Sequence, residues 1–137
     1  MYLLDTNVLS ELLKRAPAEA LVRRLREHPP ETLFTSVVCV MELRYGVMRR
    51  PDRETFWQRV HAEVLSRVQV LGFGEREALA AGELLAHLKR AGRPIGIEDV
   101  LIAATAHVHG STVVTHNTKH FQSLPHVKVE DWLAPSQ

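Results

Sequence analysis

The chain has 137 residues, of which 45% are hydrophobic and only 6% aromatic, and its formal net charge is +1. This length fits one domain with an aliphatic core, and no apolar run approaches the roughly 20 residues that a membrane-spanning helix needs. The small net charge is unlike the strong basic excess of proteins that bind nucleic acids mainly through the phosphate backbone. Basic residues nevertheless gather in short clusters, such as residues 23–26 and 89–93. Most of these fit solvated helix faces, and some are expected to border an acidic site if the substrate is a polyanion.

The N-terminus and the cysteine content predict a cytoplasmic protein. No basic region precedes the first apolar stretch, so this stretch is unlike a signal peptide. Cys39 is the single cysteine and stands among apolar residues, so we expect a buried thiol and no internal disulfide.

Short apolar and β-branched runs predict five strands. The fifth is the weakest and is expected at an edge of the sheet. The predicted strands cover Tyr2–Leu4, Leu33–Ser36, Val68–Leu71, Thr112–Thr115 and Val127–Val129.

Helical periodicity fills the segments between these strands, and capping residues or glycines mark where the helices begin and end. The expected boundaries are a cap at Thr6 or Asn7 for a helix through Leu13, a start at Pro17, caps at Ser36 and Asp52, and helices over Glu75–Ala91 and Glu98–His109 that stop at Gly92 and Gly110. This alternation of strands and helices predicts an α/β domain with a parallel sheet covered on both faces. Sites in such sheets form beyond the carboxyl ends of the strands.

Three acids stand in apolar surroundings, namely Asp5, Glu42 and Asp99. Asp5 ends the first strand, and the other two lie near the starts of helices whose ends can converge on that edge. Burying a carboxylate costs free energy, and each pair of converging carboxylates repels by roughly 3 kcal/mol at about 5 Å and an effective dielectric of about 20. A hard divalent cation removes this cost, because oxygen ligands suit Mg²⁺ and Mn²⁺. The pattern therefore predicts a metal-dependent enzyme that cuts phosphodiesters.

Each acid also has a purely structural interpretation. Asp5 can cap a helix, although Thr6 and Asn7 already offer caps, and Glu42 can lie on the polar face of an amphipathic helix. Asp99 and Glu98 can both serve the helix dipole. We choose Asp99 because it stands beside an apolar, small-residue face, and we expect Glu98 to point outward.

Four segments carry a resemblance to a known family. They are LLDTNVL at 3–9, SVVCVMELRYG at 36–46, DVLIAATA at 99–106 and VTHNTKHF at 114–121. In this order and over nearly the whole chain they resemble a PIN-domain ribonuclease, specifically the VapC-type toxin of bacterial toxin–antitoxin pairs. The resemblance implies one PIN domain over residues 1–137, an α/β/α sandwich with a five-stranded parallel sheet, and a hydrolase that cuts RNA endonucleolytically with Mg²⁺ or Mn²⁺. It also implies a homodimer, inhibition of translation and inhibition of the toxin by a small VapB-type antitoxin.

Carried over to this sequence, the family's three acids fall on Asp5, Glu42 and Asp99, which are the expected catalytic and metal-binding residues. Supporting polar positions fall on Thr6, Asn7, Ser36 and Thr115. The family often has a fourth acid after the fourth strand, but residues 115–121 contain no carboxylate. Asn117 stands at the first position open to such an acid and His120 at a later one. We expect Asn117 to be a further supporting polar residue, whose amide can still bind a metal-bound water or a ligand. We therefore expect one tightly held ion, with a second arriving with the substrate.

In the expected reaction Asp5 and Asp99 hold the ion, Glu42 binds it directly or through water, and Glu42 also orients the attacking water. In-line attack would leave a 5′-phosphate and a 3′-hydroxyl. Residues expected to hold the RNA backbone, if they are more than ordinary surface charge, are Arg44, Arg93, His116 and Lys119.

Other functions fit less well. The histidines show no spacing typical of a zinc site, and Asn7 stands where a haloacid-dehalogenase-like phosphatase needs a second Asp. A phospho-receiver module needs an Asp where Gly72-Phe73-Gly74 stands. A stand-alone PIN nuclease in RNA processing and a PIN-like RNA-binding module without catalysis both remain open. The missing fourth acid favours the binding module, and the compact length favours the toxin.

Overall fold

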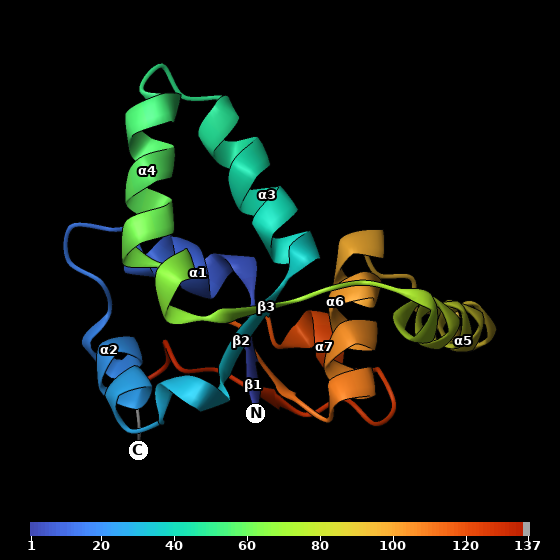
Figure 1. Ribbon diagram of the computed structural model, residues 1–137. Coiled ribbons are helices and arrows are strands. Elements are labelled where there is room, and N and C mark those ends of the chain that lie inside the picture. The colour runs from blue at the N-terminus through green and yellow to red at the C-terminus, as the bar shows by residue number, and fades with distance from the viewer. Residues whose placement is uncertain (136–137) are drawn as a thin grey trace.

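Five parallel strands form the middle layer of the protein, with helices on both sides (Figure 1). The structure is a computed structural model that describes residues 1–135. The strand order is β3-β2-β1-β4-β5. The strands are β1 at Tyr2–Leu4, β2 at Leu33–Ser36, β3 at Gln69–Leu71, β4 at Thr112–Val114 and β5 at Val129–Glu130. The predicted three-layer α/β/α class is confirmed, and the last two residues of the predicted domain, 136 and 137, lie outside the described residues.

The strand ends differ slightly from the prediction. β3 begins at Gln69 and β4 ends at Val114, one residue inside the predicted limits in each case. The fifth strand was predicted over Val127–Val129 but lies at Val129–Glu130, because Val113 and Val114 pair with these two residues. β5 is at an edge of the sheet, as expected.

The helices divide between the two faces of the sheet. They are α1 at Thr6–Leu12, α2 at Glu19–Arg26, α3 at Val37–Met48, α4 at Arg53–Glu63, α5 at Glu75–Ala91, α6 at Ile97–His109 and α7 at Lys119–Gln122, with short 3₁₀ turns at Pro30–Thr32 and Leu65–Arg67. Right-handed crossovers put α1 to α4 on one face and α5 to α7 on the other, as Figure 1 shows. The hairpin of α3 and α4 extends beyond the sheet in the same view.

Several predicted caps are confirmed, and five details of the helix ends are corrected. Two of these differ by one residue, because α1 ends at Leu12 rather than Leu13 and α6 begins at Ile97 rather than Glu98. Ser36 caps α3 by accepting a hydrogen bond from the Cys39 amide at 3.1 Å, and Gly92 and Gly110 end α5 and α6 with φ of +65° and +64°, a conformation that favours glycine. The first cap is Asp5 rather than Thr6 or Asn7, because its carboxylate accepts the Thr6 amide at 2.8 Å.

The other two corrections concern Asp52 and Pro17. Asp52 precedes α4 as expected, but its carboxylate binds Arg50 at 2.8 Å instead of the helix backbone. The second helix begins at Glu19 rather than at Pro17, since the amide of Ala18 donates to Glu11 Oε2 before the helical bonds start.

The sheet rests on a closely packed aliphatic core that fixes the edge where the polar residues gather. Leu3 and Leu4 of β1, and Val113 and Val114 of β4, have no exposed surface. Strands buried on both faces are expected to be continuously apolar. Asp5 and Thr115, which directly follow these two strands, are therefore held at fixed positions at the carboxyl edge of the sheet. No helix in the described part of the chain has the length and hydropathy to cross a membrane.

Candidate active site

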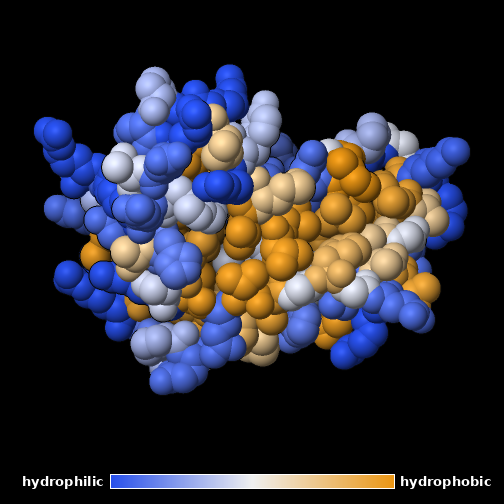
Figure 2. Space-filling view, turned by 45° about the horizontal axis from the view of Figure 1, so that its top comes forward, coloured by the Kyte–Doolittle hydropathy of each residue, from blue (hydrophilic) through white to orange (hydrophobic). Residues whose placement is uncertain are grey.

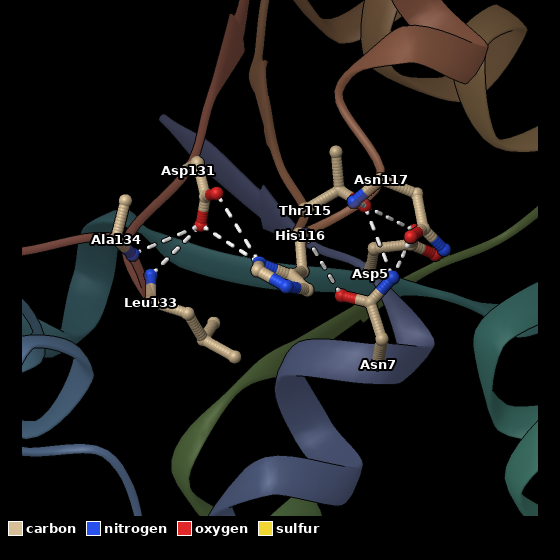
Figure 3. A network of polar contacts seen from close by, with 8 residues as sticks. All are labelled: Asp5, Asn7, Thr115, His116, Asn117, Asp131, Leu133 and Ala134. Carbon is tan, nitrogen blue, oxygen red and sulfur yellow. Dashed lines mark hydrogen bonds and ion pairs between the residues drawn. The ribbon is translucent and has the colours of Figure 1, made fainter.

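Asp5 directly follows β1, at the carboxyl end of the strand, and is only 5% exposed. Its Oδ1 accepts a hydrogen bond from the Thr6 backbone amide at 2.8 Å. Its Oδ2 accepts hydrogen bonds from the hydroxyl of Thr115 at 2.8 Å and from Nδ2 of Asn7 at 3.3 Å (Figure 3). These donors come from the start of α1 and the end of β4. The carboxylate is therefore held in one orientation by neutral groups.

Asn7 ties the same two segments together a second time. Its Nδ2 donates to Thr115 Oγ1 at 3.1 Å, and its Oδ1 accepts the backbone amide of His116 at 3.1 Å. The Asn117 amide donates to Thr115 Oγ1, also at 3.1 Å (Figure 3). Asn7 and Thr115 thus lie beside Asp5, where the sequence predicted supporting polar groups.

Glu42 comes to Asp5 from the second turn of α3. Its Oε1 accepts the Thr6 hydroxyl at 2.6 Å. One ligand atom from each of Asp5, Glu42 and Cys39 lies within 4.8 Å of the others. The structure therefore brings two of the three predicted acids to within the span of a single cation.

Burial and mutual repulsion act on both carboxyls. Burial is the main reason that the pKa of Asp5 is raised above its ordinary value; the hydrogen bonds from Thr115 and Thr6 lower it, and the charge of Asp99 raises it further. Burial is also the main cause of the raised pKa of Glu42, with the Thr6 hydroxyl lowering it and the charges of Asp5, Asp99 and Glu98 raising it. Positive charge at this position would relieve both effects.

Cys39 is a neighbour of the acids that sequence reasoning did not assign to the site. Its thiol is buried, as expected, and it donates to Asp5 Oδ1 at 3.9 Å. Burial raises the pKa of this thiol to about 11, so it stays protonated. The spacing of three residues between Cys39 and Glu42 puts both on one side of a helix, which was the available sequence clue.

Asp99 lies on the first turn of α6. Burial and hydrogen bonds have the larger effects on the pKa values of Asp5 and Glu42, and the charge of Asp99 raises both further. Among the described residues, the tight group of ligand atoms does not include it. Its Oδ2 accepts a hydrogen bond from His120 Nδ1 at 2.9 Å. Glu98 is exposed, as expected, although its charge still reaches Glu42.

The remaining predicted residues lie around this centre in different ways. Ser36 is buried and serves α3, donating to Cys39 Sγ at 3.3 Å in addition to its capping bond. The ring of His116 turns to Asp131, 3.2 Å away, and so does not face Asp5 (Figure 3). Arg44 stacks over the Trp57 ring at 4.7 Å. Asn117, Lys119 and Arg93 are exposed.

A cleft of about 470 Å³ opens beside Glu42 and Thr6, between α1 and the hairpin of α3 and α4. Its walls carry two basic side chains, Lys14 and Arg50, among largely apolar neighbours. Glu42 is therefore accessible from this cleft, whereas Asp5 stays buried behind it.

The donors present suit a hard divalent cation. The thiol of Cys39 is protonated and acts as a hydrogen-bond donor, so the groups left to bind an ion are carboxylate oxygens. Oxygen-only sites are typical of Mg²⁺ and Mn²⁺, whereas thiolate favours softer metals. Such an ion would offset the burial and the mutual repulsion that raise the pKa values of Asp5 and Glu42.

The sequence profile of the PIN domain matches residues 2–127. The chain therefore belongs to the PIN-domain family, as the resemblance predicted. Within this family it is similar to the VapC ribonuclease Y4jK of Sinorhizobium fredii, at 36% identity over 96% of this chain and 98% of the relative. It is also 32% identical to the tRNA(fMet)-specific endonuclease VapC of Salmonella typhimurium, over 96% of this chain and 97% of that one.

Solved structures agree with this placement. FitAcB from Neisseria gonorrhoeae matches with a TM-score of 0.88 and 33% identity, over 96% of this chain and 98% of that one. VapBC2 from Rickettsia felis, bound to a DNA fragment from its promoter, matches with a TM-score of 0.86 and 30% identity, over the same shares. The fold and the sequence thus point to the same group of proteins.

Proposed function

We propose that this chain is a Mg²⁺- or Mn²⁺-dependent endoribonuclease that acts in the cytoplasm as the toxin of a VapBC-type pair and inhibits translation. The observation that carries the proposal is the buried Asp5 carboxylate held within 4.8 Å of Glu42 at the carboxyl edge of the sheet. Its support from relatives is that similar chains are named ribonucleases.

Asp5, Glu42 and Asp99 would hold the ion in this proposal. A bound divalent cation would supply Lewis-acid activation of water and would neutralise the charge that builds on the phosphate. Thr115, Asn7 and the Thr6 amide keep the Asp5 carboxylate in one orientation.

Glu42 has a second part in the proposal. It is half-buried at the edge of the open cleft, and the Thr6 hydroxyl fixes one of its oxygens. Its raised pKa, caused first by burial, suits a group that accepts a proton from the attacking water.

The direct test is cleavage of labelled RNA by the purified chain. We expect internal cuts that leave 5′-phosphate and 3′-hydroxyl ends in Mg²⁺ or Mn²⁺, with a DNA strand of the same sequence left intact. The ends are identified by phosphatase treatment and ligation. Binding of RNA without any cutting in either metal would reject the enzyme and leave the RNA-binding module, the alternative that the missing fourth acid favours.

The antitoxin is the expected partner. Similar structures include complexes titled VapBC and FitAB, and the same arrangement here requires a short DNA-binding protein encoded directly upstream. Its untagged form should co-purify with the tagged chain and suppress cleavage. Sustained high expression without arrest or a partner would instead favour a stand-alone nuclease in RNA processing.

We also propose that the chain forms a homodimer through the apolar face of α3, β3 and α5. Large hydrophobic side chains on these elements are exposed, and Figure 2 shows a broad apolar band across this region. They are Val37, Met41, Tyr45, Met48, Val70, Leu79 and Leu85. Such patches on soluble proteins usually mark interaction sites.

Light scattering on the purified chain is expected to give twice the monomer mass. Leu79, which is 65% exposed, provides the test, because Leu79→Lys should shift the protein to monomers without lowering its melting temperature. Thr55→Lys, on exposed α4, is the matched control and should remain dimeric. A monomeric native chain at micromolar concentration would exclude the proposed dimer.

A further inference from the structure

The three acids of the site accept hydrogen bonds from different side chains. Asp5 is held by Thr115 and Asn7, and Glu42 by Thr6, whereas Asp99 is held by His120. The donor to Asp99 is therefore an imidazole from α7, in the segment where the family often has a fourth carboxylate.

The geometry of α7 gives this imidazole a fixed place. The neighbouring Phe121 is fully buried and anchors the helix in the core. The backbone amide of His120 itself donates to the Asn117 carbonyl at 3.1 Å, in the turn that follows Thr115. The same turn carries Thr115, which holds Asp5, so α7 is linked to two of the acids.

We propose that His120 is a positioning residue of the metal centre, and this inference rests on the proposed function. Its Nδ1–H donates to Asp99 Oδ2 at 2.9 Å and so would leave Oδ1 of the same carboxylate available to bind an ion. A neutral imidazole can donate in this way from one nitrogen. Hydrogen-bond partners of metal ligands typically contribute 10- to 100-fold, roughly, to metal affinity or activity.

A positioning role differs from two other roles for this half-exposed histidine. A surface side chain without function would affect neither metal binding nor catalysis. A residue that binds the RNA phosphate would change the KM for RNA at every metal concentration. His120 instead should act through Asp99, so its removal should be overcome by raising the metal concentration.

The test is a Mn²⁺ titration by calorimetry and by electron paramagnetic resonance. We expect His120→Ala to weaken Mn²⁺ binding by about 10-fold or more, with the melting temperature of the metal-free protein unchanged because the side chain is exposed. His120→Asn should recover most of the affinity, since its amide nitrogen occupies the place of Nδ1. His61→Ala, an exposed histidine on α4, serves as the control and should bind as the native chain does.

Kinetics provide the second readout. For His120→Ala, kcat should fall at limiting Mn²⁺ and recover at saturating Mn²⁺, with the KM for RNA unchanged. Native affinity in His120→Ala, or a raised KM that excess metal does not correct, would overturn the positioning role while the nuclease itself stands. A native chain that neither binds Mn²⁺ nor cuts RNA would overturn the proposed function together with this inference.

Discussion

Asp5→Asn is expected to lower metal-dependent RNA cleavage by about a thousandfold, equivalent to about 4 kcal/mol of transition-state stabilisation. The amide keeps the shape of the carboxylate and can still accept the Thr6 amide hydrogen. It lacks the negative charge that attracts a divalent ion, and its NH₂ group is no ligand. The loss should be seen in initial rates on labelled RNA, and expression of the variant should no longer arrest growth.

The control for this variant is Glu31→Gln, which also removes one negative charge but from an exposed residue outside the candidate site. It should cleave RNA at the native rate. Circular dichroism should show both proteins folded. Full activity in Asp5→Asn, after contaminating nuclease has been excluded, would reject the assigned site.

Removal of divalent cations is expected to abolish cleavage and to make stability fall with rising pH. Burial is the main cause that raises the folded pKa of Asp5 above its ordinary 3.8. The hydrogen bonds from Thr115 and Thr6 oppose this rise, and the charge of Asp99 adds to it. Burial likewise raises that of Glu42 above its ordinary 4.5. Between these ordinary values and the folded ones, the native state binds more protons than the unfolded chain. The contribution of these two carboxyls to the free energy of unfolding therefore decreases as the pH rises through this window and is constant above it.

A bound cation should reverse this loss. At a concentration about 100 times its Kd, an ion that binds only the folded state adds about 2.7 kcal/mol, or about 8 °C in melting temperature for a chain of this size. Thermal denaturation from pH 4 to pH 8, with EDTA and with Mg²⁺, measures both effects. In Asp5→Asn the pH dependence in EDTA should be shallower and the gain from Mg²⁺ small. Equal stability of the native chain with EDTA and with saturating Mg²⁺ would count against the metal centre.

The contacts around the acids explain why the site tolerates so much buried negative charge. Hydroxyl and amide donors surround Asp5, and a hydroxyl holds Glu42. These neutral donors lower both pKa values without adding positive charge, and burial still outweighs them. In the proposed function, a bound cation would offset the charge that these neutral donors leave uncompensated.

Local sequence patterns predicted most of the fold. The β-branched and apolar runs located every strand of the sheet, and glycines at 92 and 110 marked two helix ends correctly. The errors lie at the ends of elements, where either pairing with a distant strand or the local backbone conformation decides the boundary. β5 is set by its pairing with β4, and Asp5 became the cap of α1 because the chain leaves β1 in an extended conformation.

The sequence singled out the three acids of the candidate site and the polar side chains of Thr6, Asn7 and Thr115 beside them. It did not predict the place of Cys39 or the contact of His120 with Asp99. Asp5 stood out because a carboxylate ends an apolar run, and Glu42 because apolar residues flank it. Cys39 and His120 carried no comparable pattern, since a lone cysteine among apolar residues and a histidine on a short exposed helix are ordinary. His116 was predicted to bind RNA from its position alone, and no sequence pattern indicated that its ring lies 3.2 Å from Asp131.

The amino-acid order by itself determined the α/β class and the family, and it singled out the three carboxylates proposed for the site, because these depend on residue type and short-range spacing. Only the tertiary structure decided that Asp5 and Glu42 share one centre, that Asp99 lies just outside their tight group, and that His120 binds Asp99. These distances follow from the register of parallel strands and from the packing of α3, α6 and α7 at one edge of the sheet. Neither the strand register nor this helix packing can be obtained from neighbouring residues along the chain.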